Sequence, residues 1–194
     1  MSYMEQPNSS RPHIIVMVGI PGSGKSFFAD RFAETFKSPI ISFNKLHQAL
    51  FSNPKYDQAE YTIVKQAADY MLDEILKTGK IVVYEGLSNQ RNDRSTIVKK
   101  VQDYGYDPIF VWVQTESTTA KRRSTKSIDG RPPMSEEEFD KKLKQFNPPS
   151  ANEYAVVISG KHTYNTQLKA VLKSIITPPP KPNSPNRTNS TLTR

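Results

Sequence analysis

A glycine-rich octapeptide directly after an apolar run is the feature that most limits how this chain can fold. Residues 13–19 read His-Ile-Ile-Val-Met-Val-Gly, which is typical of a strand buried on both faces of a parallel sheet. The octapeptide follows, with glycines at its first and sixth positions and then lysine and serine. Residues 26–36 carry a phenylalanine at every fourth position, which predicts an amphipathic helix. A strand, a glycine-rich turn and a helix in this order indicate a P-loop.

The chemistry of such a turn is the binding of phosphate. Glycines let successive backbone N–H groups point into one concavity, and the following helix adds the positive end of its dipole. In a P-loop the lysine reaches the β- and γ-phosphates and the serine hydroxyl binds Mg²⁺. These roles fall to Lys25 and Ser26, so we expect ATP and Mg²⁺ as cofactors. The predicted nucleotide-binding residues are Gly19, Ile20, Pro21, Gly22, Ser23, Gly24, Lys25 and Ser26.

Apolar runs and helical patterns alternate along most of the chain. Alternation of this kind favours right-handed crossovers between parallel strands. The predicted fold class is therefore α/β, a three-layer P-loop NTPase fold with a mainly parallel five-stranded sheet, helices on both faces and a lid insertion. Beyond the first strand and helix, strands are predicted at 40–43, 81–84, 109–113 and 156–159, and helices at 45–51, 57–78, 93–104, 135–146 and 166–176.

Three segments fall outside this alternation. Residues from about 115 to 150 are charged and interrupted by prolines, and we predict a lid over the active site, with an ordinary surface insertion as the alternative. Residues 1–12 and 177–194 are polar, and the second of these segments is proline-rich and basic. Both are predicted to be disordered tails. Residues 13–176 then form one P-loop kinase domain.

Composition excludes several kinds of site. The chain has no cysteine, which rules out disulfides, thiolate-bound zinc and a cysteine nucleophile, and its three histidines are scattered along the sequence. No apolar run is long enough to span a bilayer and no signal-peptide pattern begins the chain, so we expect a cytoplasmic protein. The net charge of +8 suggests a polyanionic partner, although a solvated basic tail and a phosphate-handling cluster explain it equally.

Charges suited to phosphate chemistry follow the third and the fourth predicted strands. Glu85 ends the apolar run 81–84, where a carboxylate can hold the metal or the substrate; the alternative is a strand-end glutamate that faces solvent. Lys121, Arg122 and Arg123 follow the fourth predicted strand, where a cation can neutralise charge on the transferred phosphoryl group. Adjacent helical residues point about 100° apart, so one or two of these three bases can face the site. Arg131 is a weaker candidate.

With these residues in place, the chain resembles the small P-loop kinases that include the kinase domain of phage polynucleotide 5′-hydroxyl kinase and the zeta-toxin-like kinases. The likeness covers about residues 13–176. It is carried by the octapeptide, by Glu85 with Asn89 and Arg91, and by the three bases at 121–123. The resemblance implies that Arg122 is the lid arginine that contacts ATP phosphates, and that Glu85 stands where the polynucleotide kinase has an active-site aspartate.

The chain departs from that family after the second predicted strand. The family carries an aspartate there, which accepts the proton of the substrate hydroxyl, and an arginine three residues later. This chain has Asn44 and His47 at those positions. A neutral amide cannot act as a general base, although it can orient a hydroxyl by hydrogen bonding. His47 or Glu85 could serve as the base instead, with a structural role as the alternative for His47.

The sequence therefore predicts an ATP-dependent phosphotransferase whose catalytic residues are Lys25, Arg122, Glu85 and Asn44, with Ser26 and Glu85 at the metal. The first acceptor to consider is the 5′-hydroxyl end of a polynucleotide, given the resemblance and the basic charge. A small metabolite, such as a sugar or a nucleotide sugar, is the second. A different class of function stays open because of Asn44: a module that binds or slowly hydrolyses ATP without efficient transfer.

Overall fold

The structure is a computed structural model that describes residues 11–126 and 132–177 of the chain. Most of both predicted tails, and the candidate Arg131, lie outside the described residues. The regular elements run from residue 13 to residue 176.

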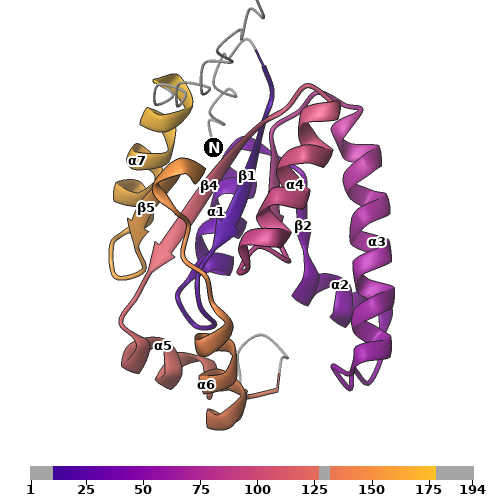
Figure 1. Ribbon diagram of the computed structural model, residues 1–194, viewed down its shortest axis with the longest axis vertical. Coiled ribbons are helices and arrows are strands. Elements are labelled where there is room, and N and C mark those ends of the chain that lie inside the picture. The colour runs from indigo at the N-terminus through magenta and orange to yellow at the C-terminus, as the bar shows by residue number, and fades with distance from the viewer. Residues whose placement is uncertain (1–10, 127–131, 178–194) are drawn as a thin grey trace, which may run out of the picture.

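Five strands form one sheet in which every neighbouring pair is parallel (Figure 1). The order across the sheet is β2-β3-β1-β4-β5, so the first strand is central and the last lies at an edge. The central strand is buried along its whole length, as its unbroken apolar run predicts. The strands are β1 (His13–Val18), β2 (Ile40–Ser42), β3 (Val82–Glu85), β4 (Asp107–Gln114) and β5 (Ala155–Ser159).

Helices cover both faces of the sheet, which confirms the predicted three-layer α/β fold. One face packs against α1 (Lys25–Phe36) and α7 (Tyr164–Ile176), and the other against α3 (Gln58–Leu76) and α4 (Arg91–Asp103). Side chains of β1 alternate between the two cores, as successive residues of a strand must. None of the helices in the described part of the chain is long and apolar enough to cross a membrane.

The helices α2 (Phe43–Leu50), α5 (Ser117–Ser124) and α6 (Glu136–Gln145) lie toward the edge of the sheet where the strands end (Figure 1). The short α2 follows β2 directly, and α5 follows β4. Next comes α6, close to the predicted helix 135–146. The short 3₁₀ helix η1 (Ala151–Glu153) was not predicted and leads directly into the start of β5. Ser135 caps the start of α6, since its Oγ accepts a hydrogen bond from the Glu138 amide at 3.1 Å.

The order of the strands fixes where a ligand can bind. After β1 the chain moves to one side of the sheet, and after β3 it crosses to the other side to form β4. In open parallel sheets of this kind, ligands bind outside the carboxyl ends of the strands, where the connections diverge. Here that place lies beyond the ends of β1 and β3, where the chain carries its P-loop and Glu85.

Candidate active site

The P-loop wraps the start of α1, and its shape depends on glycine at three positions. Gly19, Gly22 and Gly24 have φ angles of 148°, 73° and 108°, a region that other residues rarely adopt. Gly22 also has no room for a side chain, since an added Cβ would lie 2.2 Å from the carbonyl oxygen of Ala120 in α5. Close packing of α5 on the loop, and not only the turn itself, therefore requires this glycine.

Lys25 lies folded back over its own loop. Its Nζ donates hydrogen bonds to the carbonyl oxygens of Gly19 and Ile20, at 2.8 and 2.9 Å. Ser23 is fully buried, and its hydroxyl has no hydrogen-bond partner among the described residues. The loop thus combines a cation with an unused polar group beside a helix N-terminus, which suits a bound anion.

Ser26 and Glu85 meet although they lie 59 residues apart in the chain. The Ser26 hydroxyl donates to Glu85 Oε1 at 2.5 Å, and the Ser42 hydroxyl donates to Oε2 at 2.9 Å. The carboxylate is buried, with 7% of its residue surface exposed, so it is not a strand-end glutamate facing solvent. The sequence singled out Ser26 and Glu85 but not Ser42, whose only signal is its place at the end of a predicted strand.

This pair fits Mg²⁺ better than a metal held entirely by protein. Among the described residues, no group of three or more His, Cys, Asp or Glu side chains is placed to hold a metal ion. Mg²⁺ prefers oxygen ligands and takes only one or two of them from the protein, while phosphates and waters supply the rest. A hydroxyl and a carboxylate beside a phosphate-binding loop are such a set.

The loop after β3 supports the P-loop through hydrogen bonds that the sequence did not predict. Ser88 Oγ donates to the carbonyl oxygen of Met17 at 2.5 Å, and the Gly19 amide donates to Asn89 Oδ1 at 3.4 Å. Asn89 was part of the resemblance, and the structure now places it directly against the first glycine of the cradle.

Arg94, in α4, is fully buried and connects residues 147–153, at and just beyond the end of the predicted lid segment (about 115–150), to this loop. Its guanidinium donates to both carboxylate oxygens of Glu153, at 2.6 and 3.1 Å. It also donates to the carbonyl oxygens of Ser88 and Asn147, at 3.0 and 2.8 Å. Burial alone would raise the pKa of the Glu153 carboxyl, but the bonds from Arg94 and Ser150 lower it below its usual value. Sequence reasoning missed Arg94, because nothing local marks an arginine as buried.

The three bases of α5 point in three different directions. Lys121 forms ion pairs with Glu136 and Asp140 of α6, at 3.0 and 3.1 Å, and the hydrogen bonds to these acids raise its pKa. Arg123 donates to the carbonyl oxygen of Gly160 at 3.4 Å, in the turn that lies against Ser23 of the P-loop. Arg122 is exposed, on the side of α5 opposite the buried Ala120.

Asn44 and His47 are both in α2 but have different surroundings. Asn44 is half-buried and lies two residues beyond Ser42, whose hydroxyl binds Glu85. His47 is buried; its ring stacks on Tyr56 with centroids 4.7 Å apart, and its Nε2 lies 3.3 Å from Glu60 Oε2. The surroundings of His47 fit a structural role, since its ring packs inside the α2–α3 connection.

Side chains of the lid segment pack against the P-loop itself. Ile20 is buried in a small apolar cluster with Ala120 of α5 and Phe139 of α6. The entry of the segment is fixed in addition by Thr115, whose hydroxyl donates to the carbonyl oxygen of Ser23 at 2.9 Å. Movement of α5 or α6 would therefore change the packing around Ile20 of the phosphate-binding loop.

A comparison with protein families matches residues 14–149 to the AAA domain family AAA_33. The chain belongs to this family. The matched region includes the P-loop, Glu85 and most of the lid segment, so the site described above lies within the AAA domain. A search of curated protein sequences found no match.

Solved structures of small kinases share the fold of this AAA domain. A sugar kinase from Janibacter sp. superimposes with a TM-score of 0.61 at 14% identity, over 84% of this chain and 93% of that one. A gluconokinase from Sinorhizobium meliloti gives 0.58 at 17% identity, over 85% and 91%. A chain of the Pnkp1/Rnl/Hen1 complex gives 0.53 at 18% identity, over 66% and 47%. At these identities the likeness establishes a P-loop kinase-like fold, without a specific relation to phage polynucleotide kinase.

Proposed function

We propose that this AAA domain is an ATP-dependent kinase that transfers the γ-phosphate of ATP to a hydroxyl acceptor. The observation that carries the proposal is the contact of Ser26 with the buried Glu85 at the mouth of the P-loop. A phosphate-binding loop needs no buried carboxylate merely to hold an anion, whereas phosphoryl transfer needs Mg²⁺ on the β- and γ-phosphates.

Each residue of the site has a part in this reaction. Lys25 would leave the carbonyl oxygens of Gly19 and Ile20 and bind the phosphates of ATP. Ser26 and Glu85 would hold Mg²⁺, which neutralises charge on the phosphates when bound.

Asn44 would orient the acceptor hydroxyl without taking its proton, which a loose phosphoryl transfer tolerates. For the cation on the transferred group, Arg122 is our first candidate by resemblance. Arg123 is the second, because its guanidinium already lies beside the turn against the P-loop.

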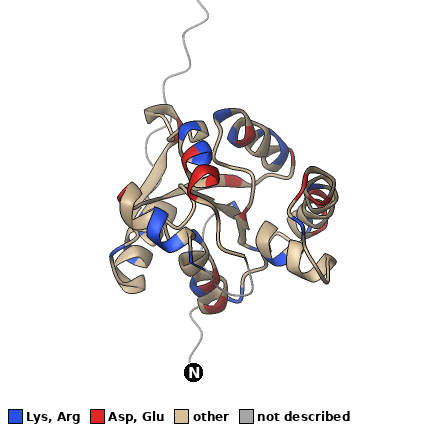
Figure 2. Cartoon of the chain, turned by 90° about the horizontal axis from the view of Figure 1, so that it is seen from below, with Lys and Arg blue, Asp and Glu red and all other residues tan. Residues whose placement is uncertain are grey.

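For the acceptor, two observations support a small hydroxyl compound over a polynucleotide end. His47, three residues after Asn44, is buried against Tyr56 and offers no exposed charge to a nucleic-acid backbone. Figure 2, which views the molecule from the end where α5 and α6 lie, shows Lys and Arg on several separate helices with Asp and Glu among them. In the described part of the chain this mixture of charges favours a small acceptor, because polynucleotide binding calls for clustered bases.

A second candidate function is a module that binds or slowly hydrolyses ATP. The observation in its favour is that Asn44 replaces the acid expected of these kinases, while both oxygens of Glu85 already accept hydrogen bonds from serines. Such a module would bind ATP normally and give no phosphorylated acceptor. In either case the use of ATP and the lack of cysteine fit our proposal of a cytoplasmic protein.

The test offers γ-labelled ATP and Mg²⁺ with three groups of acceptors: 5′-hydroxyl oligonucleotides, sugars, and sugar acids such as gluconate. Lys25→Ala should lose transfer, and Asn44→Asp should raise it by a factor of about 10–100 by restoring a general base. Asn92→Asp, which adds the same charge at an exposed position of α4, is the matched control and should leave transfer unchanged.

Each outcome of this assay selects one proposal. Label on an oligonucleotide that declines steeply as salt rises would establish the polynucleotide acceptor. Label on a sugar or sugar acid would establish the small-molecule kinase. ATP binding without transfer, in both the parent and Asn44→Asp, would overturn the kinase proposal and leave the nucleotide-binding module.

A further inference from the structure

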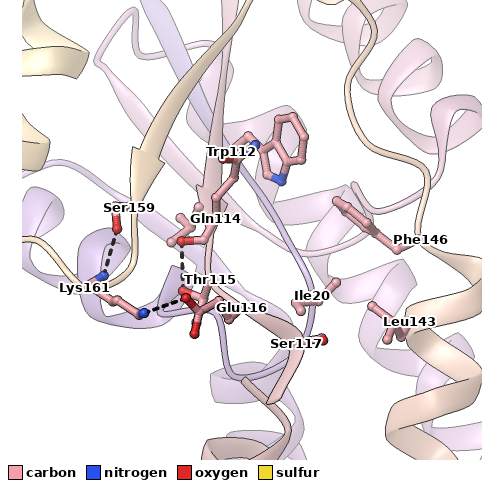
Figure 3. A pocket seen from close by; sticks show the side chains of 11 residues that line it. Ile20, Trp112, Gln114, Thr115, Glu116, Ser117, Leu143, Phe146, Ser159 and Lys161 are labelled. Carbon is pink, nitrogen blue, oxygen red and sulfur yellow. Dashed lines mark hydrogen bonds and ion pairs between the residues drawn. The ribbon is translucent and has the colours of Figure 1, made fainter. Parts of the chain in front are cut away.

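Trp112, the only tryptophan of the chain, lies between two cavities on the face of the sheet that also carries α4. The first cavity, of about 500 Å³, extends from Trp112 to Phe146 and Leu143 near α6 (Figure 3). The second, of about 350 Å³, lies on the other side, beside Tyr154 and Pro149. Because the two cavities share Trp112, we treat them as one feature, the Trp112 groove.

The groove exists because the edge of the sheet is open on this face. β5 is the edge strand, and α7 packs against its opposite side. Val157 of β5 is consequently 50% exposed, while its neighbour Ile158 is 4% exposed. An aromatic ring and an exposed valine on a sheet are an apolar surface that lacks a cover in the described part of the chain.

The sequence contains a segment whose chemistry suits this groove. Residues 178–187 read Pro-Pro-Pro-Lys-Pro-Asn-Ser-Pro-Asn-Arg and directly follow the described residues. Proline-rich segments are bound by grooves lined with aromatic rings, because the polyproline helix is already extended and loses little entropy on binding. The proposed site of phosphoryl transfer gives this segment no role.

The place where α7 ends also supports binding of this segment in the Trp112 groove. Ser174, on the last turns of α7, lines the second cavity, so the chain leaves α7 at the rim of the groove. Ten residues of polyproline helix span about 31 Å. The five residues of β5 span about 17 Å, so the segment is long enough to follow this strand from one cavity to the other.

We propose that residues 178–187 bind in the Trp112 groove of their own chain. The prolines pack against Trp112, Tyr154 and Val157, and the far end of the segment enters the first cavity. That cavity is also lined by Ile20 of the P-loop and by Phe146 just after α6, so the bound segment contacts both the phosphate-binding loop and the lid segment. Binding itself does not depend on the proposed kinase reaction and can be measured without ATP.

The single tryptophan makes a direct test possible in the full-length chain. Pro178, Pro179, Pro180 and Pro182 are changed together to serine, and Trp112 emission and its quenching by acrylamide are compared with those of the parent. The expected result is emission at longer wavelength and a quenching constant larger by about twofold, since one face of the indole becomes open to water. The matched control changes Asn189, Ser190 and Thr191 to alanine in the same tail and should leave both values unchanged.

A peptide with the sequence of residues 178–187 completes the test. Added to the proline-to-serine protein, it should restore the parent's emission, and a peptide with serine at the same four positions should not. Equal quenching in the parent and the proline-to-serine protein, with no effect of the peptide, would overturn the proposal. Protection of Trp112 that depends on protein concentration would overturn it as well, because the groove would then be covered by a second copy of the chain.

Discussion

The P-loop and the start of α2 lie at the same edge of the sheet, but they are built in different ways. The P-loop is made mainly by backbone: three glycines with positive φ and a turn packed against α5. The β2–α2 region is made by side chains, with Ser42 on Glu85, a half-buried Asn44 and a buried His47. In our proposal the first holds the phosphates of ATP and the second meets the acceptor.

These two ways of building the site differ in how much sequence change they tolerate. A backbone cradle binds any phosphate of the right size and depends on glycine, so most substitutions destroy it. The β2–α2 region depends on side chains, so it can carry Asn44 in place of an acid and His47 in place of an arginine without loss of the fold. We therefore expect substitutions in the P-loop to have large effects and substitutions in α2 to have small ones. Substitutions that affect the loop after β3, which supports the P-loop, should have intermediate effects.

Gly22→Ala should have the largest effect. Its φ of 73° is left-handed and the new Cβ would overlap the Ala120 carbonyl oxygen at 2.2 Å. The free energy of unfolding should fall by about 3 kcal/mol, and ATP binding should be lost. Chemical denaturation and ATP titration measure the two effects. Gly79→Ala is the control, because Gly79 also has a positive φ but open space around it, and it should cost about 1–2 kcal/mol without changing ATP affinity. Equal losses in the two variants would mean that packing of α5 on the loop is unimportant.

Arg94→Lys should have the next largest effect, since Arg94 holds the loop after β3 through the carbonyl oxygen of Ser88. Lysine keeps the charge but has three donors on a single nitrogen, so it cannot reproduce the four hydrogen bonds of the planar guanidinium, and the free energy of unfolding should fall by about 2–3 kcal/mol. Hydrogen exchange should also show weaker protection of residues 147–153. Arg91→Lys, an exposed arginine on the same helix, should change stability by less than about 0.5 kcal/mol. Unchanged protection in a folded Arg94→Lys protein would remove the role that we give this arginine.

Glu153→Gln tests the charge of the Arg94 partner through the pH dependence of stability. The folded pKa of Glu153 lies below its usual value of 4.5, so its contribution to stability is present above that value and is lost as pH falls through the folded pKa. At pH 7 the parent should be more stable than the glutamine variant by on the order of 1 kcal/mol. The difference should shrink as the pH is lowered below 4.5, as followed by urea denaturation. A difference that does not vary with pH would show that the charge on Glu153 contributes nothing.

His47→Phe should have only a small effect on stability and none on phosphoryl transfer, as expected for a side chain of α2. Phenylalanine preserves the stacking on Tyr56, and Glu60 keeps the backbone donors of Lys55 and Tyr56. Stability should change by less than about 1.5 kcal/mol, and the rate of phosphoryl transfer should stay the same. A tenfold loss of transfer in a stable His47→Phe protein would instead make His47 the base that Asn44 cannot be.

Much of this molecule could be predicted from local pattern. The β1 run, the glycine turn and the spaced phenylalanines of α1 predicted the central unit, and the alternation of strands and helices predicted the three layers, which the structure confirms. The positions of Ser26 and Glu85 followed from the same reasoning, because carboxyl ends of neighbouring parallel strands meet at one edge. Strand order was not predicted, since it depends on contacts between residues far apart in the chain.

Backbone conformation and periodicity can be read from the sequence alone, and they predicted the P-loop, the buried strands and every α-helix that covers the sheet. The absence of an acid at Asn44 followed from the resemblance to the small P-loop kinases. The partners of individual charged side chains became known only from the packing of the folded chain. In the fold Lys121 pairs with acids of α6, Arg123 bonds Gly160 and Arg94 pairs with Glu153. His47 is buried. A lone charged side chain carries no local signal of its partner, because the partner is chosen by the packing of elements that are distant in sequence.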